Sequence, residues 1–194
     1  MNFKFTTIMK KISIIGGGII GLCSAYYLAK EGHEVVVFDK SDMTDGCSYG
    51  NAGMIVPSHI IPMAQPGMIA QGMKWMFDSK SPFYVKPRLN YDLMKWGLQF
   101  YKHATPQHVE KSMPALRDLA LLSKELFQDL DRVNPSFFYE EKGLLMLYKT
   151  DKVAEEMQHE GKEAERLGLE VDYLSKEGVS KLEIGTRTDV IGGV

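Results

Sequence analysis

Cysteine is scarce in this chain, and no sign of charge dominates it. Cys23 and Cys47 are the two cysteines among 194 residues, and they form neither a Cys-x-x-Cys pair nor a cluster with histidine at metal-binding spacing. A disulfide framework and a metal site therefore have no support, and we expect reduced thiols in a cytoplasmic protein. With 23 basic and 25 acidic residues, the formal net charge of -2 gives no electrostatic basis for nucleic acid as a partner.

No targeting signal is expected either. The opening "MNFKFTTIMKK" has few apolar residues between its lysines, and no small-residue cleavage site follows it. We expect residues 1–10 to be a short leader to the first strand. With 44% hydrophobic and 25% charged residues, the composition is that of a globular protein of one large or two small domains.

Charged residues are absent from the stretch Ile12 to Ala29, which is long enough to be a candidate membrane span. The stretch also contains a Gly17-x-x-x-Gly21 pair of the kind that packs membrane helices together. Three consecutive glycines, at 16–18, lie inside it, and each would cost a helix up to about 1 kcal/mol relative to alanine. The stretch is therefore predicted to break at the glycines and not to cross a membrane.

The alternative is a strand, a turn, a helix and a second strand. Residues 11–15 are rich in β-branched isoleucine and are predicted to be a short strand. Ile19 to Lys30 is predicted to be a helix closed by Gly32, and residues 34–39 a second buried strand. This order within about 30 residues is the unit that a dinucleotide-binding fingerprint requires. The predicted fold class is α/β, with a Rossmann-like domain.

Within this unit the pattern Gly16-x-Gly18-x-x-Gly21 gives each glycine a physical task. The first permits a tight turn, the second lets the backbone approach a pyrophosphate, and the third lets helix and strand pack closely. The N–H groups at the helix start then hold the phosphates. Asp39 follows at the end of the second strand, where it can accept hydrogen bonds from a ribose diol and disfavour the 2′-phosphate of NADP.

The fingerprint serves FAD and NAD alike, and the next loop distinguishes them. The segment "DGCSYGNAGMIVPSH", Asp45 to His59, is rich in small residues and leaves the point where the reactive end of the cofactor lies. Glycine and alanine let backbone N–H groups approach a flavin ring. This loop favours FAD, and it leaves an NAD-dependent dehydrogenase or a non-catalytic nucleotide-binding fragment as alternatives.

At these residues the chain resembles the FAD-dependent D-amino-acid dehydrogenases, within the D-amino-acid oxidase and glycine oxidase group. The matching stretches are "IIGGGIIGLCSAYYLAKEGHEVVVFDK", "CSYGNAGMIVPSH", "PMAQPGM", "KWMFDSKSPFYVKPRL" and "GLLMLY", with a weaker match in "LSKEGVSKLE". The family often has glutamate where Asp39 stands, and alanine or threonine where Cys47 stands. The resemblance implies non-covalent FAD and a Rossmann-like FAD-binding domain joined to part of an α+β substrate domain.

The resemblance also implies which residues bind the cofactor. The pyrophosphate is expected at the glycine turn, the adenosine ribose at the end of the second strand, and the flavin along residues 48–54. The implied cofactor-binding residues are Gly16, Gly18, Ile19, Ile20, Gly21, Asp39, Lys40, Cys47, Ser48, Asn51, Ala52, Gly53 and Met54. Tyr49 and His59 flank the flavin loop and are candidates to face the substrate, with loop hydrogen bonding as the alternative for His59 and a small packed thiol as the alternative for Cys47.

The family reaction moves a hydride from the α-carbon of a D-amino acid to flavin N5, and the imino acid then hydrolyses to a 2-oxo acid and ammonia. A D-amino acid and an electron acceptor, a quinone or oxygen, are the implied partners, with a homodimer and a peripheral association with the inner membrane left open. The arginine that clamps the substrate carboxylate lies beyond residue 194 in the family. No catalytic residue is therefore assigned, and Arg88, Arg117, Arg132, Arg166 and Arg187 inherit no role.

Family members are about twice as long, so the resemblance implies that this is an N-terminal half, inactive alone and poor at retaining FAD. We expect the FAD-binding part to occupy residues 1–75, with a helical connection and the start of a substrate domain in residues 76–194. Met113, Leu116, Leu119, Ala120, Leu126 and Leu130 predict a long amphipathic helix over residues 106–132. Further predictions are short helices after Ile60, helices at 151–167 and 175–182, and strands at 141–149, at 170–174 and from residue 189.

Overall fold

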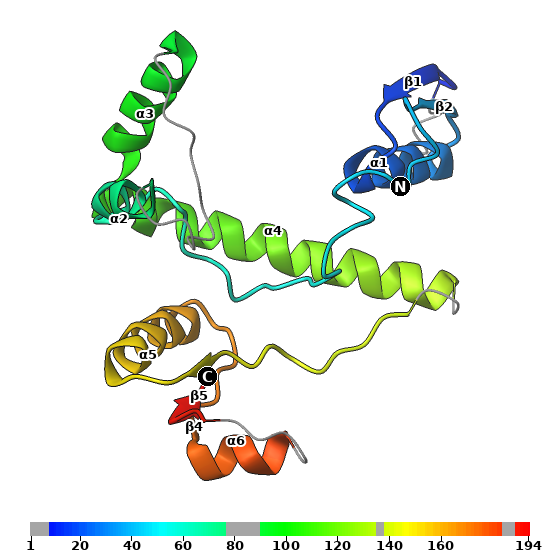
Figure 1. Ribbon diagram of the computed structural model, residues 1–194. Coiled ribbons are helices and arrows are strands. Elements are labelled where there is room, and N and C mark those ends of the chain that lie inside the picture. Colours follow the sequence, from blue (N-terminus) through cyan, green and yellow to red (C-terminus); the bar gives the residue numbers. More distant parts are fainter. Residues whose placement is uncertain (1–7, 77–89, 135–137, 184–188) are drawn as a thin grey trace, which may run out of the picture. The chain divides into compact units, whose positions relative to one another are not determined.

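The computed structural model describes residues 8–76, 90–134, 138–183 and 189–194 (Figure 1). The chain forms two compact units, Met1–Met54 and Ile55–Val194, and each is described by itself. The sequence predicts a boundary between functional domains after residue 75. That boundary stays a prediction, because the compact units are defined by packing alone.

The first unit is a parallel β-α-β arrangement. It consists of β1 (Lys11–Ile15), α1 (Ile19–Lys30) and β2 (Glu34–Phe38), and β1 pairs with β2 from Lys11 opposite Glu34 to Ile15 opposite Phe38. Gly32 follows the end of α1 with a φ of 88°, in the left-handed region that favours glycine, and its N–H donates to Ala29. The predicted strand, turn, helix and strand are confirmed, and Asp39 comes directly after β2.

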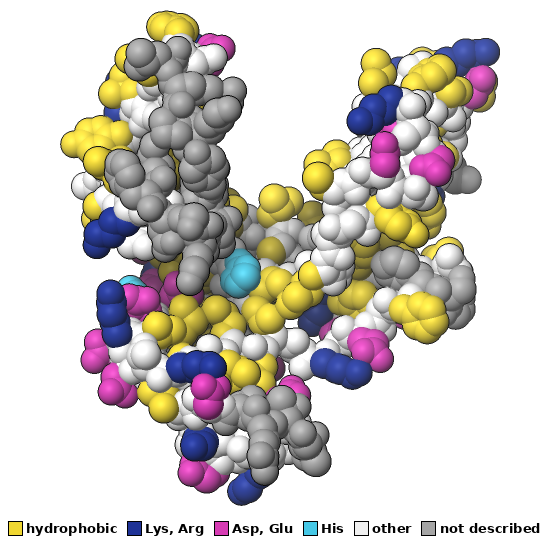
Figure 2. Space-filling view, viewed as in Figure 1, with side chains coloured by type: hydrophobic (Ala, Val, Ile, Leu, Met, Phe, Trp, Pro, Cys, Tyr) yellow, Lys and Arg dark blue, Asp and Glu magenta, His cyan; other side chains and the backbone are white. Residues whose placement is uncertain are grey.

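The first unit buries little apolar surface of its own. None of the residues of α1 is buried, and Ile15 at the end of β1 is 92% exposed. Figure 2 shows hydrophobic side chains on the visible surface of this part of the molecule. Its local shape therefore depends on backbone hydrogen bonds and on glycine geometry more than on a packed core.

The charge-free stretch is divided between β1, the glycine turn and α1, which has 12 residues. No helix among the described residues combines the length and the apolar character needed to cross a membrane. The strand-and-turn interpretation of this stretch is the correct one.

Helices dominate the second unit. They begin with α2 (Met68–Met76), α3 (Tyr91–His103) and α4 (Pro106–Val133), which confirms the predicted short helices and the long amphipathic one. The side chain of Asn90 accepts hydrogen bonds from the first turn of α3, and that of Thr105 accepts one from His108 in α4. These N-caps fix where the two helices start.

Two more helices lie toward the C-terminus, α5 (Asp151–Arg166) and α6 (Lys176–Leu182). Thr150 caps α5 and Ser175 caps α6, each accepting a hydrogen bond from a backbone N–H of its helix. Both helices, and the capping role of Ser175, are confirmed.

A small antiparallel sheet accompanies these helices, in the order β3 (Leu147–Tyr148), β5 (Gly192–Gly193) and β4 (Leu174–Ser175). The predicted strand near the C-terminus is confirmed in β5. Glycine is required in β5 because a Cβ on Gly192 would lie 2.5 Å from the Tyr148 hydroxyl and 2.7 Å from the Leu174 carbonyl oxygen.

The two other predicted strands are much shorter than the sequence suggests. Of residues 141–149 only β3 is strand, and residues 170–173 are not strand at all. Val171 packs instead against the core, and the Tyr173 hydroxyl donates to Glu165 of α5, so this segment follows the helix and pairs only at its end. Apolar alternation here reflects packing on a helix and not a strand ladder.

The core of the second unit brings together distant parts of the sequence. Ile60 is 1% exposed, and it clusters with Met113 of α4 and Ala164 of α5. Leu119, which we expected on the apolar face of α4, is 66% exposed, so that face is narrower than predicted. The segment just after the first unit is thus anchored in the helical core by Ile60.

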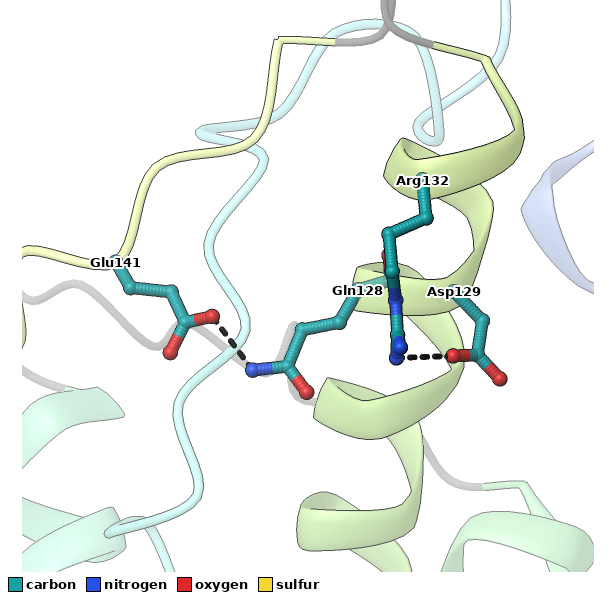
Figure 3. A network of polar contacts seen from close by, with 4 residues as sticks. All are labelled: Gln128, Asp129, Arg132 and Glu141. Atoms are coloured by element: carbon teal, nitrogen blue, oxygen red, sulfur yellow. Dashed lines mark hydrogen bonds and ion pairs between the residues drawn. The ribbon is translucent and has the colours of Figure 1, made fainter.

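The C-terminal part of α4 is tied to the segment that follows it by polar contacts (Figure 3). The Gln128 amide donates to Glu141 at 2.5 Å, and Lys124 forms an ion pair with the same carboxylate at 2.9 Å. These partners lower the pKa of Glu141, and the hydrogen bond to Glu141 raises the pKa of Lys124. Arg132 pairs with Asp129 along the helix.

Candidate dinucleotide-binding site

The glycine turn between β1 and α1 has a geometry that only glycine allows. Gly16 adopts a φ of 107°, and its N–H donates to the Phe38 carbonyl oxygen at 2.7 Å, which ties the turn to the end of β2. A Cβ on Gly21 would lie 1.9 Å from the carbonyl oxygen of Gly16. Helix and turn therefore approach each other as the third glycine of the fingerprint requires.

Asp39 binds this turn directly. Its Oδ2 accepts a hydrogen bond from the Gly17 N–H at 2.6 Å, and its Oδ1 accepts one from the Ser41 N–H at 3.0 Å. The bond from Gly17, followed by that from Ser41, lowers the pKa of Asp39 below its ordinary value of 3.8. The carboxylate is ionised at neutral pH and lies where a ribose diol is expected to bind.

The loop after Asp39 contributes residues that the sequence analysis did not assign. The Ser41 hydroxyl donates to Asp45 at 2.5 Å, and the Thr44 hydroxyl donates to Asp42 at 2.6 Å. Met43, with a φ of 71°, lies against Gly17, where an added Cβ would meet its Sδ at 2.6 Å. Alternating serine, threonine and aspartate after a strand is a signal for such side-chain-bonded turns.

Ser48 connects the glycine turn to the predicted flavin loop. Its hydroxyl oxygen accepts a hydrogen bond from the Ile19 N–H at 3.0 Å, at the first residue of α1. A Cβ on Gly18 would lie 3.1 Å from the same oxygen. The structure thus brings residues 29 positions apart together at the helix N-terminus, which is the end that favours phosphate.

Asn51 organises the loop from within. Its amide nitrogen donates to the Ser48 carbonyl oxygen at 2.7 Å and to the Cys47 carbonyl oxygen at 3.0 Å. Its amide oxygen accepts from the Gly53 N–H at 2.6 Å, and Gly53 has a φ of 64°. The loop therefore has a defined backbone path across the residues expected to contact flavin.

The other residues expected to bind FAD lie at the surface of the same unit. Ile20 is 81% exposed at the start of α1, and Ile19, Lys40, Ala52 and Met54 are exposed as well. Cys47 is also exposed, so its interpretation as a small packed thiol is wrong. An exposed position next to the turn leaves these side chains accessible to a ligand, and their contact with FAD stays a prediction.

The two substrate candidates belong to different units. Tyr49 lies in the first unit and is 72% exposed, and His59 lies in the second beside the buried Ile60. Burial raises the pKa of Glu160 in α5, and the nearby charge of His59 opposes that shift. Neither residue has a role assigned by its contacts.

The arginines have structural partners where the structure describes them. Arg117 donates to the Leu167 carbonyl oxygen at 2.8 Å, Arg132 pairs with Asp129, and Arg166 pairs with Glu110 and Glu163. Arg88 and Arg187 lie outside the described residues. No group of three or more histidine, cysteine or acidic side chains suited to a metal occurs in the part of the chain that the structure describes.

A parallel β-α-β unit with this glycine turn and a carboxylate after the second strand defines a dinucleotide-binding protein. The comparison with protein families identifies the family of dinucleotide-binding proteins to which the chain belongs. Residues 11–194 match the model of the DAO family, described as FAD dependent oxidoreductase, and the chain belongs to this family.

Curated relatives carry the name D-amino acid dehydrogenase. The protein from Helicobacter pylori is 35% identical over 143 residues, which is 74% of this chain and 35% of the relative. Those from Granulibacter bethesdensis and Vibrio atlanticus are 29% and 30% identical, and each match covers 95% of this chain and 45% of the relative. The chain thus spans less than half the length of these relatives.

Among solved structures, the chain is similar to glycine oxidase from Geobacillus kaustophilus, with a TM-score of 0.60 and 22% sequence identity. The match covers 96% of this chain and 39% of that one, and it shows the fold. The α/β prediction is confirmed.

FAD is the cofactor of this family, and the residues present fit its diphosphate. The turn carries no side chains because residues 16–18 are all glycine, and it leads directly into the positive N-terminal end of α1. The turn and the start of α1 would hold the pyrophosphate, and Asp39 the ribose.

Proposed function

We propose that this protein oxidises D-amino acids to 2-oxo acids and ammonia, and that it passes the electrons to a quinone or to oxygen. The proposal rests on membership of an FAD-dependent oxidoreductase family and on relatives that are named D-amino acid dehydrogenase at 29% to 35% identity. Because the chain spans less than half the length of those relatives, the activity is proposed for the whole protein.

The structural observation that supports the cofactor part of the proposal is the bond between the Ile19 N–H and the Ser48 hydroxyl oxygen, at 3.0 Å. An extended dinucleotide such as FAD needs a phosphate turn and, beyond it, backbone that follows its second half. The bond joins the 47–53 loop to the start of α1, and Asn51 gives that loop a defined path, which supports the proposal.

The residues of this chain serve binding and orientation. The glycine turn is complementary to two phosphates, and the ionised Asp39 is an acceptor for ribose hydroxyls. When bound, FAD supplies the redox chemistry by accepting the hydride that leaves the α-carbon of the amino acid. The side chains that hold the amino acid carboxylate are not assigned to this chain.

The test is anaerobic reduction of the full-length gene product by amino acids. Addition of D-alanine or D-proline is expected to bleach the visible flavin absorption, with one equivalent of 2-oxo acid formed per flavin reduced. L-alanine serves as the matched control, since it differs only in configuration, and it is expected to leave the absorption unchanged. Flavin bands that persist with every D-amino acid tested would contradict the proposal while leaving the protein a flavoprotein.

The electron acceptor follows from the second half of the same experiment. Reduced protein is mixed with oxygen or with a soluble quinone, and the rate at which the flavin absorption returns is compared between the two acceptors.

We propose a cytoplasmic protein, on the basis of its free cysteines, and fractionation of cells into cytosol and inner membrane tests that location.

A further inference from the structure

We propose that Asn51 is a positioning residue that couples the 47–53 loop to the phosphate-binding turn, and that it acts through Ser48. The inference goes beyond the proposed function. It rests on the use of FAD by this family and does not depend on which amino acid is oxidised.

The Asn51 side-chain amide forms its hydrogen bonds within the 47–53 loop. A primary amide has two N–H donors and one carbonyl oxygen. Both donors are used by loop carbonyls, those of Cys47 and Ser48, and the oxygen accepts from the Gly53 N–H. Since the donors are already engaged by the protein backbone, this side chain shapes the loop and is not itself a donor to a ligand.

Ser48 is held from both sides. Its carbonyl oxygen accepts the 2.7 Å bond from Asn51, while its hydroxyl oxygen accepts the 3.0 Å bond from Ile19. The hydroxyl also lies so close to Gly18 that a Cβ there would be 3.1 Å away. A shift of Ser48 in either direction therefore breaks the bond to Ile19 or collides with the turn.

This arrangement joins the two ends of the predicted FAD site. The Ile19 N–H is at the N-terminus of α1, where the helix dipole and the N–H groups favour phosphate. Residues 52–54, which follow Asn51, are those expected along the flavin. A change at Asn51 is thus transmitted through Ser48 to the phosphate end.

The test is a double-mutant cycle on the full-length gene product. Asn51→Ala, Ser48→Ala and the double variant are compared for the dissociation constant of FAD and for the visible spectrum of bound flavin. Each single variant is expected to weaken FAD binding about tenfold, and the double variant about as much as one single variant, because both changes break the same link. Asn51→Asp keeps the size and the acceptor but loses both donors, and it is expected to match Asn51→Ala.

Asn90→Ala is the matched control, since Asn90 also organises backbone N–H groups, as the N-cap of α3 in the second unit. It is expected to lower the unfolding temperature without changing the flavin spectrum or the affinity for FAD. Two results would overturn the inference: losses in affinity that multiply in the double variant, or Asn51→Ala and Asn51→Asp proteins with wild-type affinity and spectrum. D-amino-acid oxidation is not among the readouts, so failure of the proposed function gives a different result from failure of this one.

Discussion

The two compact units of this chain are stabilised by different kinds of interaction. In the first, α1 has no buried residue, and the deciding feature is the close approach of α1 to the glycine turn, where a Cβ on Gly21 would lie 1.9 Å from the Gly16 carbonyl oxygen. In the second, distant segments meet in a core around Ile60, Met113 and Ala164. The first unit is shaped by glycine geometry and backbone hydrogen bonds, and the second by apolar packing.

This difference predicts two kinds of mutational effect. Substitutions at the glycine turn should act on FAD binding, because they alter the space and the N–H groups that a diphosphate needs. Substitutions in the second core should act on the free energy of unfolding, because they remove buried apolar contacts.

The largest effect is expected from Gly21→Ala. The new methyl group would lie 1.9 Å from the Gly16 carbonyl oxygen, so either the turn or α1 must move. FAD binding should fall by at least about a hundredfold, since a displaced turn no longer presents its N–H groups to the phosphates. Equilibrium titration followed by flavin fluorescence measures the change.

Gly97→Ala is the control for this substitution. Gly97 lies inside α3 with nothing within 4 Å of an added Cβ, so alanine should preserve FAD affinity and stabilise the helix by about 0.5–1 kcal/mol. Equal FAD affinity in the Gly21→Ala and Gly97→Ala proteins would show that the turn is not the phosphate site.

In the second unit, Ile60→Ala is expected to lower the free energy of unfolding by about 2–5 kcal/mol, since it leaves a cavity in a site that is 1% exposed. Ile60→Val removes a single methylene and should cost about 0.5–1.5 kcal/mol. Chemical denaturation measures both values. Two variants with the same loss would contradict the close packing of Ile60 against Met113 and Ala164.

In the first unit, Asp39→Asn is expected to lower FAD affinity less than Gly21→Ala does. It removes the charge that accepts from Gly17 and Ser41, and FAD affinity should fall about tenfold because a neutral amide oxygen is a weaker acceptor. The same titration of wild-type and variant protein measures this change. Unaltered affinity would place the ribose elsewhere.

The pH dependence of Asp39 has a defined sign. Its pKa in the folded protein lies below 3.8, chiefly through the bond from Gly17, so the unfolded chain binds this proton more tightly than the folded one. The stabilisation is fully present above that ordinary value and is lost as pH falls through the lower folded pKa. The difference in unfolding midpoint between wild type and Asp39→Asn should therefore shrink over that window.

The smallest effect is expected at a helix cap of the second unit. Thr105→Ala removes the oxygen that accepts from the His108 N–H at the start of α4, and it should cost about 1 kcal/mol of stability. Thr105→Ser keeps that oxygen and should recover most of the loss in a denaturation experiment. FAD affinity should be unchanged in both variants. A change in affinity would contradict the assignment of FAD binding to the first unit and of stability to the core of the second.

The first unit could be predicted from the sequence because its signals are local. Three glycines at fixed spacing, two β-branched runs and an acidic residue at the strand end are read within one short stretch, and β1, α1 and β2 were placed within one residue of their bounds. The hydrogen-bond partners of the Asn51 side chain could not be predicted from the sequence. An asparagine in a small-residue loop serves a ligand or the backbone equally well until its partners are known.

The second unit shows where local signals fail. Caps and amphipathic spacing predicted α4, α5 and α6, but residues 170–173 alternate like a strand and pack on α5 instead. The burial of Ile60 depends on Met113 and Ala164, which are far from it in sequence. Contacts of this kind are decided by tertiary packing and leave no pattern in the segment itself.

The most direct test of the account is an equilibrium titration of the full-length apoprotein with FAD and, in parallel, with NADH. We expect one FAD to bind per chain, excess NADH not to displace it, and Gly21→Ala to weaken the binding at least about a hundredfold. Binding of NADH without FAD, or FAD binding that survives Gly21→Ala unchanged, would contradict the assignment of the glycine turn as the FAD site.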